Sequence, residues 1–258
     1  ELSNELFNPG EAYPQNRWAI AAGMAYDESL GLEPDILSSR LRFITKRSAE
    51  IFYIFQQVFG AQARQRVVNV LPGFIVFDAN NNTLLESFND LTLNPNQVMP
   101  DALAIGAYFG WPVADVINQN GENESITPAE IVHRAREEIT VTLPDPLSPG
   151  EVNESIASMI ARNKTVAQNH GVRLIAYEGG QHIVQNMGWS NDPVLGTKAI
   201  EANRHPDMYG AYRELMDTWT QNNDDLFVHY SLFRRPTIHW GSFGALEWTE
   251  QLPSSSIK

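Results

Sequence analysis

Short apolar segments typical of buried strands alternate along this chain with segments that have a helical pattern. The strand-like segments are residues 66–72, 102–109, 173–178 and 226–230, and residues 1–8 resemble the end of a further strand that runs into a loop. Residues 102–109 are almost wholly apolar, as expected for a parallel strand covered on both faces. Strands separated by helices pair in parallel through crossovers, so the alternation predicts an α/β fold with a parallel sheet.

Apolar spacing predicts helices over residues 12–30, 34–60 and 206–222. The first of these has its apolar residues at helical intervals, and Gly60 is a typical end for the second. The Asn-rich residues 78–97 are expected to form a loop, and residues 241–248 a final short helix or turn.

Two further helices are predicted from their start signals. Residues 127–130 place a threonine before a proline and a glutamate three positions on, which is the pattern of a capped first turn. Residues 148–151 repeat this pattern with a serine, so we expect a helix from there to about His170.

The charge and composition exclude several classes of function. The chain has 258 residues, enough for one large domain or two small ones, with 31 acidic and 18 basic residues and a formal net charge of -13. This balance argues against nucleic acid and anionic membranes as partners. There is no cysteine, no HExxH motif, no phosphate-binding glycine loop and no GxSxG motif, so we expect neither a metal nor a cofactor.

The compartment is less constrained by the sequence. No run of apolar residues is long enough for a transmembrane helix, and no signal pattern opens the sequence. Four glycosylation sequons, at Asn81, Asn123, Asn153 and Asn163, favour a secreted or extracellular protein only weakly, because several are expected by chance.

Several side chains that can take part in catalysis lie at the carboxyl ends of the expected strands, where parallel α/β barrels hold their active sites. Glu5 and Glu178 are carboxylates at two such ends, and two glycines follow Glu178, which allows a ligand or backbone to approach closely. Tyr108 ends another strand, and His229 and Tyr230 end the last one. Two carboxylates that face a sugar are the groups that glycoside hydrolysis needs.

Tryptophans could supply flat apolar surfaces for sugar rings beside these carboxylates. Trp111, Trp189 and Trp240 all follow expected strands. A desolvated carboxylate such as Glu178 also tends to have a shifted pKa, which suits acid, base or nucleophile chemistry.

Three segments resemble the clan A retaining glycoside hydrolases, which are (β/α)8 barrels. Residues 3–8 (Ser-Asn-Glu-Leu-Phe-Asn) resemble the motif after the fourth strand of that family, and residues 177–182 (Tyr-Glu-Gly-Gly-Gln-His) the motif at the seventh. Residues 107–110 are similar to the sixth-strand segment, and Trp240 is similar to the tryptophan at the eighth strand. Phe7 and Ala107 stand where the family usually has Trp and Pro.

The resemblance implies roles for individual residues. Glu178 corresponds to the nucleophile and Glu5 to the acid/base, while Asn4 corresponds to the residue that contacts the sugar 2-hydroxyl. Tyr108 matches a tyrosine that commonly hydrogen-bonds the nucleophile. His182 and Trp240 are further candidates for substrate binding.

The implied fold is a TIM-barrel type of which residues 1–258 form a single partial catalytic-type domain with strands four to eight. Strands one to three have no counterpart, so we expect a fragment of a larger barrel whose N-terminal half is missing, with a β-linked poly- or oligosaccharide as substrate. The alternative is a non-catalytic structural or carbohydrate-binding protein on a similar scaffold. In that case Glu178 could form a structural ion pair, Glu5 could lie on the surface, and His182 could be a hydrogen-bonded loop histidine. Tyr108, His229 and Trp240 could serve packing.

Overall fold

The computed structural model describes residues 1–3, 5–8, 13–145, 150–185, 192–223, 225–252, 254 and 256. Its internal contacts divide the chain into two compact units. Unit 1 consists of residues 1–106 and 162–175, and unit 2 of residues 107–161 and 176–258. The prediction of a single domain over the whole chain stays a prediction.

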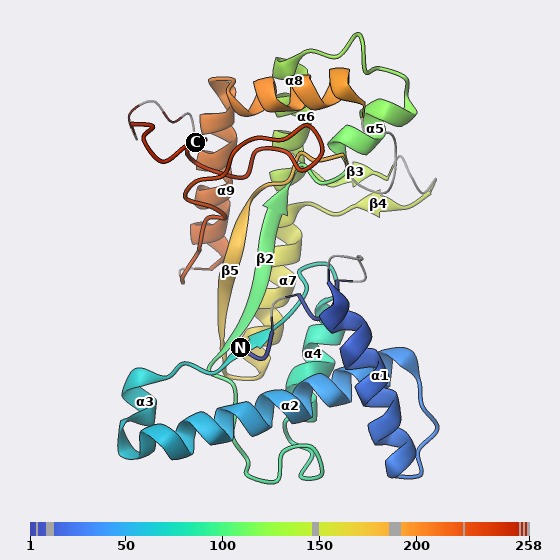
Figure 1. Cartoon of the computed structure of the whole chain (residues 1–258), viewed down its shortest axis with the longest axis vertical. Helices are drawn as coiled ribbons and strands as arrows, with labels where there is room; N and C mark the ends of the chain where they lie inside the picture. Colours follow the sequence, from blue (N-terminus) through green and yellow to red (C-terminus); the bar gives the residue numbers. More distant parts are fainter. Residues whose placement is uncertain are drawn as a thin grey trace. The chain divides into compact units, whose positions relative to one another are not determined.

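A three-stranded parallel sheet confirms the expected α/β class. It consists of β1 (Val70–Pro72), β2 (Ala102–Phe109) and β5 (Arg173–Gln181), in the spatial order β1-β2-β5 (Figure 1). In its register, Val70 pairs with Ala102 and Pro72 with Ala104. The strands therefore follow one another in space in the order in which they occur in the chain.

The expected strand at 66–72 is shorter than predicted, because its first residue closes a helix. The segment begins after η1 (Gly60–Gln62) and α3 (Ala63–Arg66), and only its last three residues pair with β2. The expected strand at 226–230 is an irregular extended segment. It forms one isolated parallel bridge, between Phe227 and Ala176 of β5.

In unit 1, α2 (Ile36–Phe59) packs against α1 (Pro14–Ser29) and α4 (Asp78–Ser87). The two long helices were predicted, and α2 ends as expected at Gly60, whose φ of 51° suits a residue without a Cβ. Asp35 caps its start by accepting a hydrogen bond from Ser38 N at 2.8 Å.

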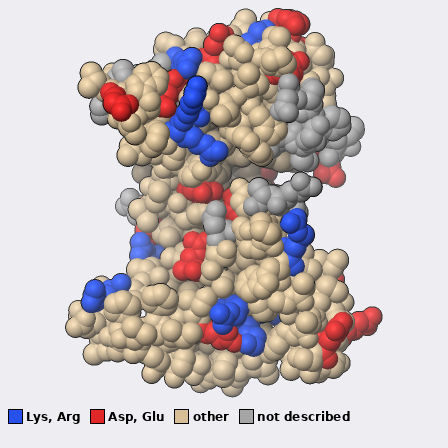
Figure 2. All heavy atoms as spheres, viewed as in Figure 1, with Lys and Arg blue, Asp and Glu red and all other residues tan. Residues whose placement is uncertain are grey.

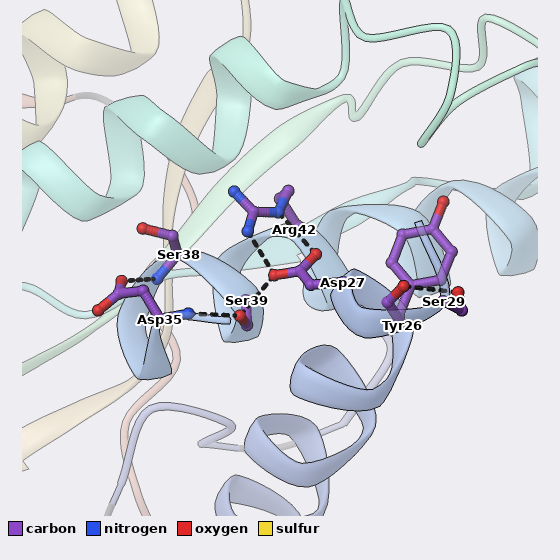
Figure 3. A network of polar contacts seen from close by, with 7 residues as sticks. All are labelled: Tyr26, Asp27, Ser29, Asp35, Ser38, Ser39 and Arg42. Atoms are coloured by element: carbon purple, nitrogen blue, oxygen red, sulfur yellow. Dashed lines mark hydrogen bonds and ion pairs between the residues drawn. The ribbon is translucent and has the colours of Figure 1, made fainter. Parts of the chain in front are cut away.

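A buried carboxylate joins α1 to α2 (Figure 3). Asp27 of α1 is fully buried and forms an ion pair with Arg42 of α2, whose Nε donates at 2.9 Å. The hydroxyl of Ser39 also donates to Asp27. The hydrogen bond from Arg42 holds the pKa of Asp27 below its usual value. The helices approach closely here, since a Cβ on Gly23 would lie 2.3 Å from the carbonyl oxygen of Ser39.

The prediction of a loop over 78–97 was wrong for its first half, which forms α4. The asparagines there stabilise the helix from its buried side. Asn81 accepts a hydrogen bond from Phe74 N at 3.1 Å and donates through Nδ2 to Asn163 at 2.7 Å. Asn163 Nδ2 donates in turn to Ile75 O at 2.8 Å. Both amides are buried, so two of the four sequons have their acceptor nitrogens inside the folded chain.

Unit 2 contains α5 (Val113–Gln119), α6 (Pro128–Thr140), α8 (Pro193–Asn203) and α9 (Asp207–Asn222), and α6 packs against both α8 and α9. The predicted capping box of α6 is confirmed, with Thr127 and Glu130 bonded reciprocally. Helix α9 was also predicted.

Helix α8 was missed, although its start carries a clear signal. Asp192 accepts hydrogen bonds from Val194 N and Leu195 N, and Pro193 occupies the first helical position.

The expected helix start at 148–151 was wrong. Residues 148 and 149 lie outside the described part of the chain, but Val152–Asn153 is strand β4, which pairs with β3 (Leu143–Pro144). Helix α7 begins at Ile156 and ends at Asn169. Glycine at position 150 has a φ of 94°, which is outside the helical region and explains why the turn is not continued as a helix.

Two further expectations concern the ends of the sequence. Residues 1–3 and 5–8 contain no strand, and Glu5 to Phe7 form a turn. Residues 241–248 form bridges and bends, including a parallel bridge between Phe233 and Leu246, and not the expected helix or turn.

On the face drawn in Figure 2, basic side chains form small separate groups, and no continuous basic surface is visible. Within the described ranges, no helix has the length and apolar character needed to cross a membrane.

Candidate functional site

Strand β5 contains a β-bulge at Glu178, which lies within the strand, three residues before its last residue Gln181, and not at its end as predicted. Residues 226–230 lie beside β5 and begin a regular parallel ladder with it, in which Ala176 N donates to Leu226 O and Val228 N donates to Ala176 O. The next bond of that ladder, from Tyr230 N, would reach the carbonyl of Glu178, but it reaches Gly179 at 3.0 Å. One extra residue is therefore inserted in β5 between Ala176 and Gly179.

On the β2 side, β5 also has one extra residue, between Arg173 and His182. Arg173 N donates to Asp101 O at 3.0 Å, and His182 N donates to Phe109 O at 2.7 Å, so nine steps along β5 match eight along β2. Bulges of this kind are common beside active sites, because they change the direction of nearby side chains. This feature makes the surroundings of Glu178 the first candidate site.

The two glycines after Glu178 are required by close packing. A Cβ on Gly179 would lie 2.6 Å from Ala107 O and 2.6 Å from the ring of Phe227, so no side chain fits. Gly180 has a φ of 140°, which side chains rarely allow. The sequence suggested that these glycines admit a ligand, but the structure shows that they admit neighbouring protein atoms. They lie within β5 rather than in the loop after it.

Two residues predicted for the site, Tyr108 and His182, lie together at the carboxyl ends of β2 and β5. Their rings are 5.4 Å apart in an edge-to-face arrangement. Phe243, from the C-terminal segment, contacts both, at 6.3 Å from the Tyr108 ring and 5.5 Å from the His182 ring. Figure 1 shows this segment passing the ends of the two strands. Edge-to-face contacts fix the orientation of all three rings.

The same cluster includes a tyrosine and an arginine. Tyr230 packs its ring 5.6 Å from that of Phe243 and accepts a hydrogen bond from Arg234 Nη1 at 2.9 Å. The guanidinium of Arg234 also lies 5.4 Å from the ring of Phe243. Hydrogen bonds between Ser231 and the 243–245 segment hold the C-terminal chain in place. The cluster therefore combines apolar ring faces with fixed hydrogen-bond donors.

His182 is an uncharged member of this cluster at neutral pH. Burial lowers its pKa to about 4, because the imidazolium form loses its hydration among the neighbouring rings. Its Nδ1 atom is buried and has no hydrogen-bond partner among the described residues. His182 is therefore a neutral member of the cluster and does not supply a positive charge.

A buried carboxylate supports the turn that follows β2. Glu138 of α6 is 9% exposed, and its Oε2 accepts a hydrogen bond from Gly110 N at 2.7 Å. Burial raises the pKa of Glu138 to about 7, although the hydrogen bonds from the backbone of Gly110 and Trp111 favour the ionised form. The turn that carries the half-exposed Trp111 is thus anchored by an acid that titrates near neutral pH.

A second polar contact lies behind the strand ends. The hydroxyl of Tyr212 accepts a hydrogen bond from Gln181 N at 3.2 Å and lies 3.2 Å from Nε2 of His229. Burial raises the pKa of Tyr212, so the phenol is protonated over the whole working range. His229, considered earlier as a residue at the end of a strand, is thereby held in a structural contact.

Glu5 belongs to unit 1 and Glu178 to unit 2. Glu5 has a left-handed backbone with a φ of 48°, and its carboxylate accepts a hydrogen bond from Asn8 Nδ2 at 3.0 Å. The predicted strand end at this position is therefore a tight turn. Asn4 lies outside the described residues. Phe7 stacks on Phe74, with ring centroids 4.4 Å apart.

Trp240 lies in a tight turn between Thr237 and Gly241, which exchange backbone hydrogen bonds at 2.9 and 3.0 Å. Its side chain is 52% exposed and meets the ring of His239 edge-on. The alternative that Trp240 packs in a core is therefore wrong. A Cβ on Gly241 would lie 2.7 Å from Ile183 O, so the turn lies close to the residues that follow β5. Trp189 lies outside the described residues.

The sequence did not point to Phe243, Arg234 or Glu138. Phe243 and Arg234 belong to an irregular tail whose pairing has no periodic pattern. Glu138 is one of several charged residues of an amphipathic helix, and the signal for its burial is its position seven residues after Ile131 and three after Ala135, on the apolar face.

Searches of protein-family models, curated proteins and solved structures found no significant match to this chain. In the ranges that the structure describes, no group of three or more histidine, aspartate or glutamate residues is arranged to hold a metal ion.

Proposed function

We propose that this chain is part of a retaining glycoside hydrolase that acts on β-linked poly- or oligosaccharides. The observation that carries the proposal is the β-bulge at Glu178, in the second half of a parallel strand and in the same unit as the cluster of Tyr108, His182 and Phe243. A carboxylate in the same unit as fixed aromatic rings and hydrogen-bond donors suits a sugar ring, which has apolar faces and polar edges.

The order of the strands supports a barrel of the (β/α)8 type. In doubly wound sheets the strand order reverses at a switch point. Here β1, β2 and β5 are neighbours in chain order, and residues 226–230 continue the same order beside β5. Such an arrangement corresponds to strands five to eight of a barrel, with the catalytic groups at the carboxyl ends. The completion of the barrel by further strands stays a prediction.

The proposed reaction is a double displacement. Glu178 attacks the anomeric carbon while Glu5 donates a proton to the leaving glycosidic oxygen, which gives a covalent glycosyl–enzyme and a free alcohol. Glu5, now a carboxylate, then takes a proton from water, and the water oxygen attacks the anomeric carbon and releases Glu178. This mechanism needs the two carboxyl groups about 5–5.5 Å apart in the active protein. Asn4 would hold the 2-hydroxyl, and Trp240 and Tyr108 would border the sugar.

A non-catalytic carbohydrate-binding protein is the second candidate, and the conformation of Glu5 favours it. An acid/base residue at the end of a strand is extended, whereas Glu5 has a left-handed backbone in a tight turn and its carboxylate is bonded to Asn8. In this case the aromatic cluster would bind sugar without turnover.

The deciding experiment is covalent trapping with mass spectrometry. The chain is incubated with 2-deoxy-2-fluoro-β-glycosides of glucose, xylose and mannose, since the fluorine slows hydrolysis of the glycosyl–enzyme. We expect an added mass on the peptide that contains Glu178. Hydrolysis of β-linked oligosaccharides should fall at least ~10³-fold in Glu178→Gln.

Two controls separate the candidates. Glu137→Gln removes an exposed glutamate of α6 in the same unit and should leave turnover unchanged. Glu5→Gln should slow the first step least for substrates with good leaving groups, because these need no proton. Sugar binding without trapping or turnover in the intact chain would favour the non-catalytic candidate, and full activity of Glu178→Gln would remove the nucleophile assignment.

A further inference from the structure

Unit 2 contains an open cavity of about 640 Å³ whose walls come from α8 and from the C-terminal segment. Thr197, Ile200 and Glu201 form the α8 side, together with Arg204 at the end of the helix. The other side consists of Arg235, Pro236, Glu247 and Trp248. The volume lies within the range of roughly 300–1,000 Å³ that is usual for small-molecule sites. None of these residues belongs to the cluster around His182.

One wall of the cavity is held rigid by a bidentate ion pair. Arg204 donates through Nε and Nη2 to the two carboxylate oxygens of Glu247, both at 2.7 Å. The hydrogen bonds that Arg204 donates to the Glu247 carboxylate raise the pKa of the guanidinium. A fork-to-fork pair orients both side chains, so a ligand that binds beside them does not need to order them.

Two charged groups of the cavity retain their full hydrogen-bonding capacity. Arg235 and Glu201 have exposed side chains without a hydrogen-bond partner in the described part of the chain, and Glu201 interacts electrostatically with Arg204. Arg234, the preceding residue, is turned to Tyr230 and Phe243, whereas Arg235 lines the cavity. Of these two adjacent arginines, one therefore belongs to the aromatic cluster and the other to the cavity.

Trp248 adds a flat apolar surface to these polar groups. Its side chain is 52% exposed although it lines the cavity, so a large part of the indole is open to a ligand. An aromatic face, a carboxylate acceptor and a guanidinium donor are together complementary to a pyranose, whose C–H groups form apolar faces and whose hydroxyls both donate and accept. The wall carries two cations and two anions, so its formal charge is balanced.

We propose that this cavity is a second carbohydrate site that takes a neutral sugar ring stacked on Trp248, with hydroxyls bonded to Glu201 and Arg235. The site goes beyond the proposed hydrolase, because binding here requires neither Glu5 nor Glu178. It would hold a chain of sugars on the protein surface without cleaving it. Acidic and basic sugars should bind less well, because a wall of balanced charge gives no net attraction to offset the loss of their hydration.

The test measures binding by calorimetry and by ligand-observed NMR. The probes are cellotetraose, xylotetraose and laminaritetraose, each added to the Glu178→Gln chain so that no substrate is consumed. At least one of them should bind, and Trp248→Ala should weaken that binding at least tenfold. Arg235→Gln and Glu201→Gln should each weaken it several-fold.

Trp18→Ala serves as the matched control. Trp18 lies on α1 in unit 1 and is 46% exposed, so its loss removes a similar surface elsewhere. Binding should be unchanged in this variant, and thermal unfolding should confirm that both tryptophan variants are folded. Tetragalacturonate, which is acidic, and chitotetraose with free amines, which is basic, test the charge balance. Both should bind less well than the neutral sugars.

Three outcomes would overturn the proposal: no binding of the neutral sugars, binding that survives Trp248→Ala, or binding of the charged sugars alone. The outcome is separate from that of the hydrolase proposal. Trp248-dependent binding in a chain that hydrolyses nothing would contradict only the hydrolase, and hydrolysis without such binding would contradict only the second site.

Discussion

The backbone N–H of Tyr230 donates a hydrogen bond to the carbonyl of Gly179 at 3.0 Å, one residue beyond the acceptor that a regular ladder would use. This shift places an extra residue beside Glu178 and ends the regular pairing of residues 226–230 with β5. The bulge explains why a segment with the pattern of a strand forms only an isolated bridge.

Close packing around the bulge leads to a first prediction. Gly179→Ala should destabilise the chain by about 3 kcal/mol, because the new Cβ would overlap Ala107 O and the ring of Phe227. Gly210→Ala in α9 is the matched control, since its Cβ would meet only the flexible end of Arg136, at 3.2 Å. This control should be neutral or should stabilise by about 0.5–1 kcal/mol. Urea unfolding of both variants checks the difference, and equal stabilities would contradict the packing argument.

The buried Glu138 gives a second prediction. Its folded-state pKa of about 7 lies above the unfolded value of 4.5, so the folded chain binds more protons between these values and stability falls as pH rises through this window. Glu138→Gln keeps an acceptor for Gly110 N but cannot ionise. At pH 8 the variant should be as stable as the parent or more stable, by up to ~3 kcal/mol. Thermal unfolding from pH 4 to 8 measures this, and a strongly destabilised variant at pH 8 would contradict the prediction.

His182 gives a third prediction, because its effect on the pH dependence of stability has the opposite sign to that of Glu138. Its folded-state pKa of about 4 lies below the unfolded value of 6.5, so the unfolded chain binds more protons in this window and stability falls as pH drops from 6.5 to 4. His182→Phe retains the ring contacts with Tyr108 and Phe243 and removes the titration. Its stability should depend less on acid than that of the parent, and NMR titration of the parent should show a neutral imidazole at pH 6. A charged imidazole at that pH would refute the assignment.

The ion pair in unit 1 provides a fourth prediction. Asp27→Asn should cost about 3 kcal/mol, because it leaves the guanidinium of Arg42 without its buried partner. Glu50→Gln on the same helix α2 breaks contacts to Lys46 and Arg47 that are more exposed, and it should cost less than about 1 kcal/mol. The pKa of Asp27 is lowered, so its contribution is complete above pH 3.8 and is lost as pH falls through the folded-state value. Chemical unfolding of the two variants at pH 7 and pH 3 tests both the size and the pH dependence.

The sequence by itself determined the elements whose side chains repeat regularly or whose ends have a local signal. The apolar run of 102–109 predicted β2, and the threonine, proline and glutamate of 127–130 predicted the start of α6. These predictions succeeded because burial on both faces of a strand, and capping of a first turn, depend on neighbours that are close in the chain.

The tertiary structure decided the features that depend on partners distant in the chain. Asn81 forms part of a helix rather than a loop because Phe74 and Asn163 satisfy its amide, and no local pattern encodes those partners. The bulge at Glu178 arises from pairing with residues 226–230, about fifty positions later in the chain. Likewise, Phe243 reaches Tyr108 and His182 only through the course of the C-terminal segment. A sequence shows which side chains can do chemistry, but their grouping is fixed by long-range contacts that have no periodic signature.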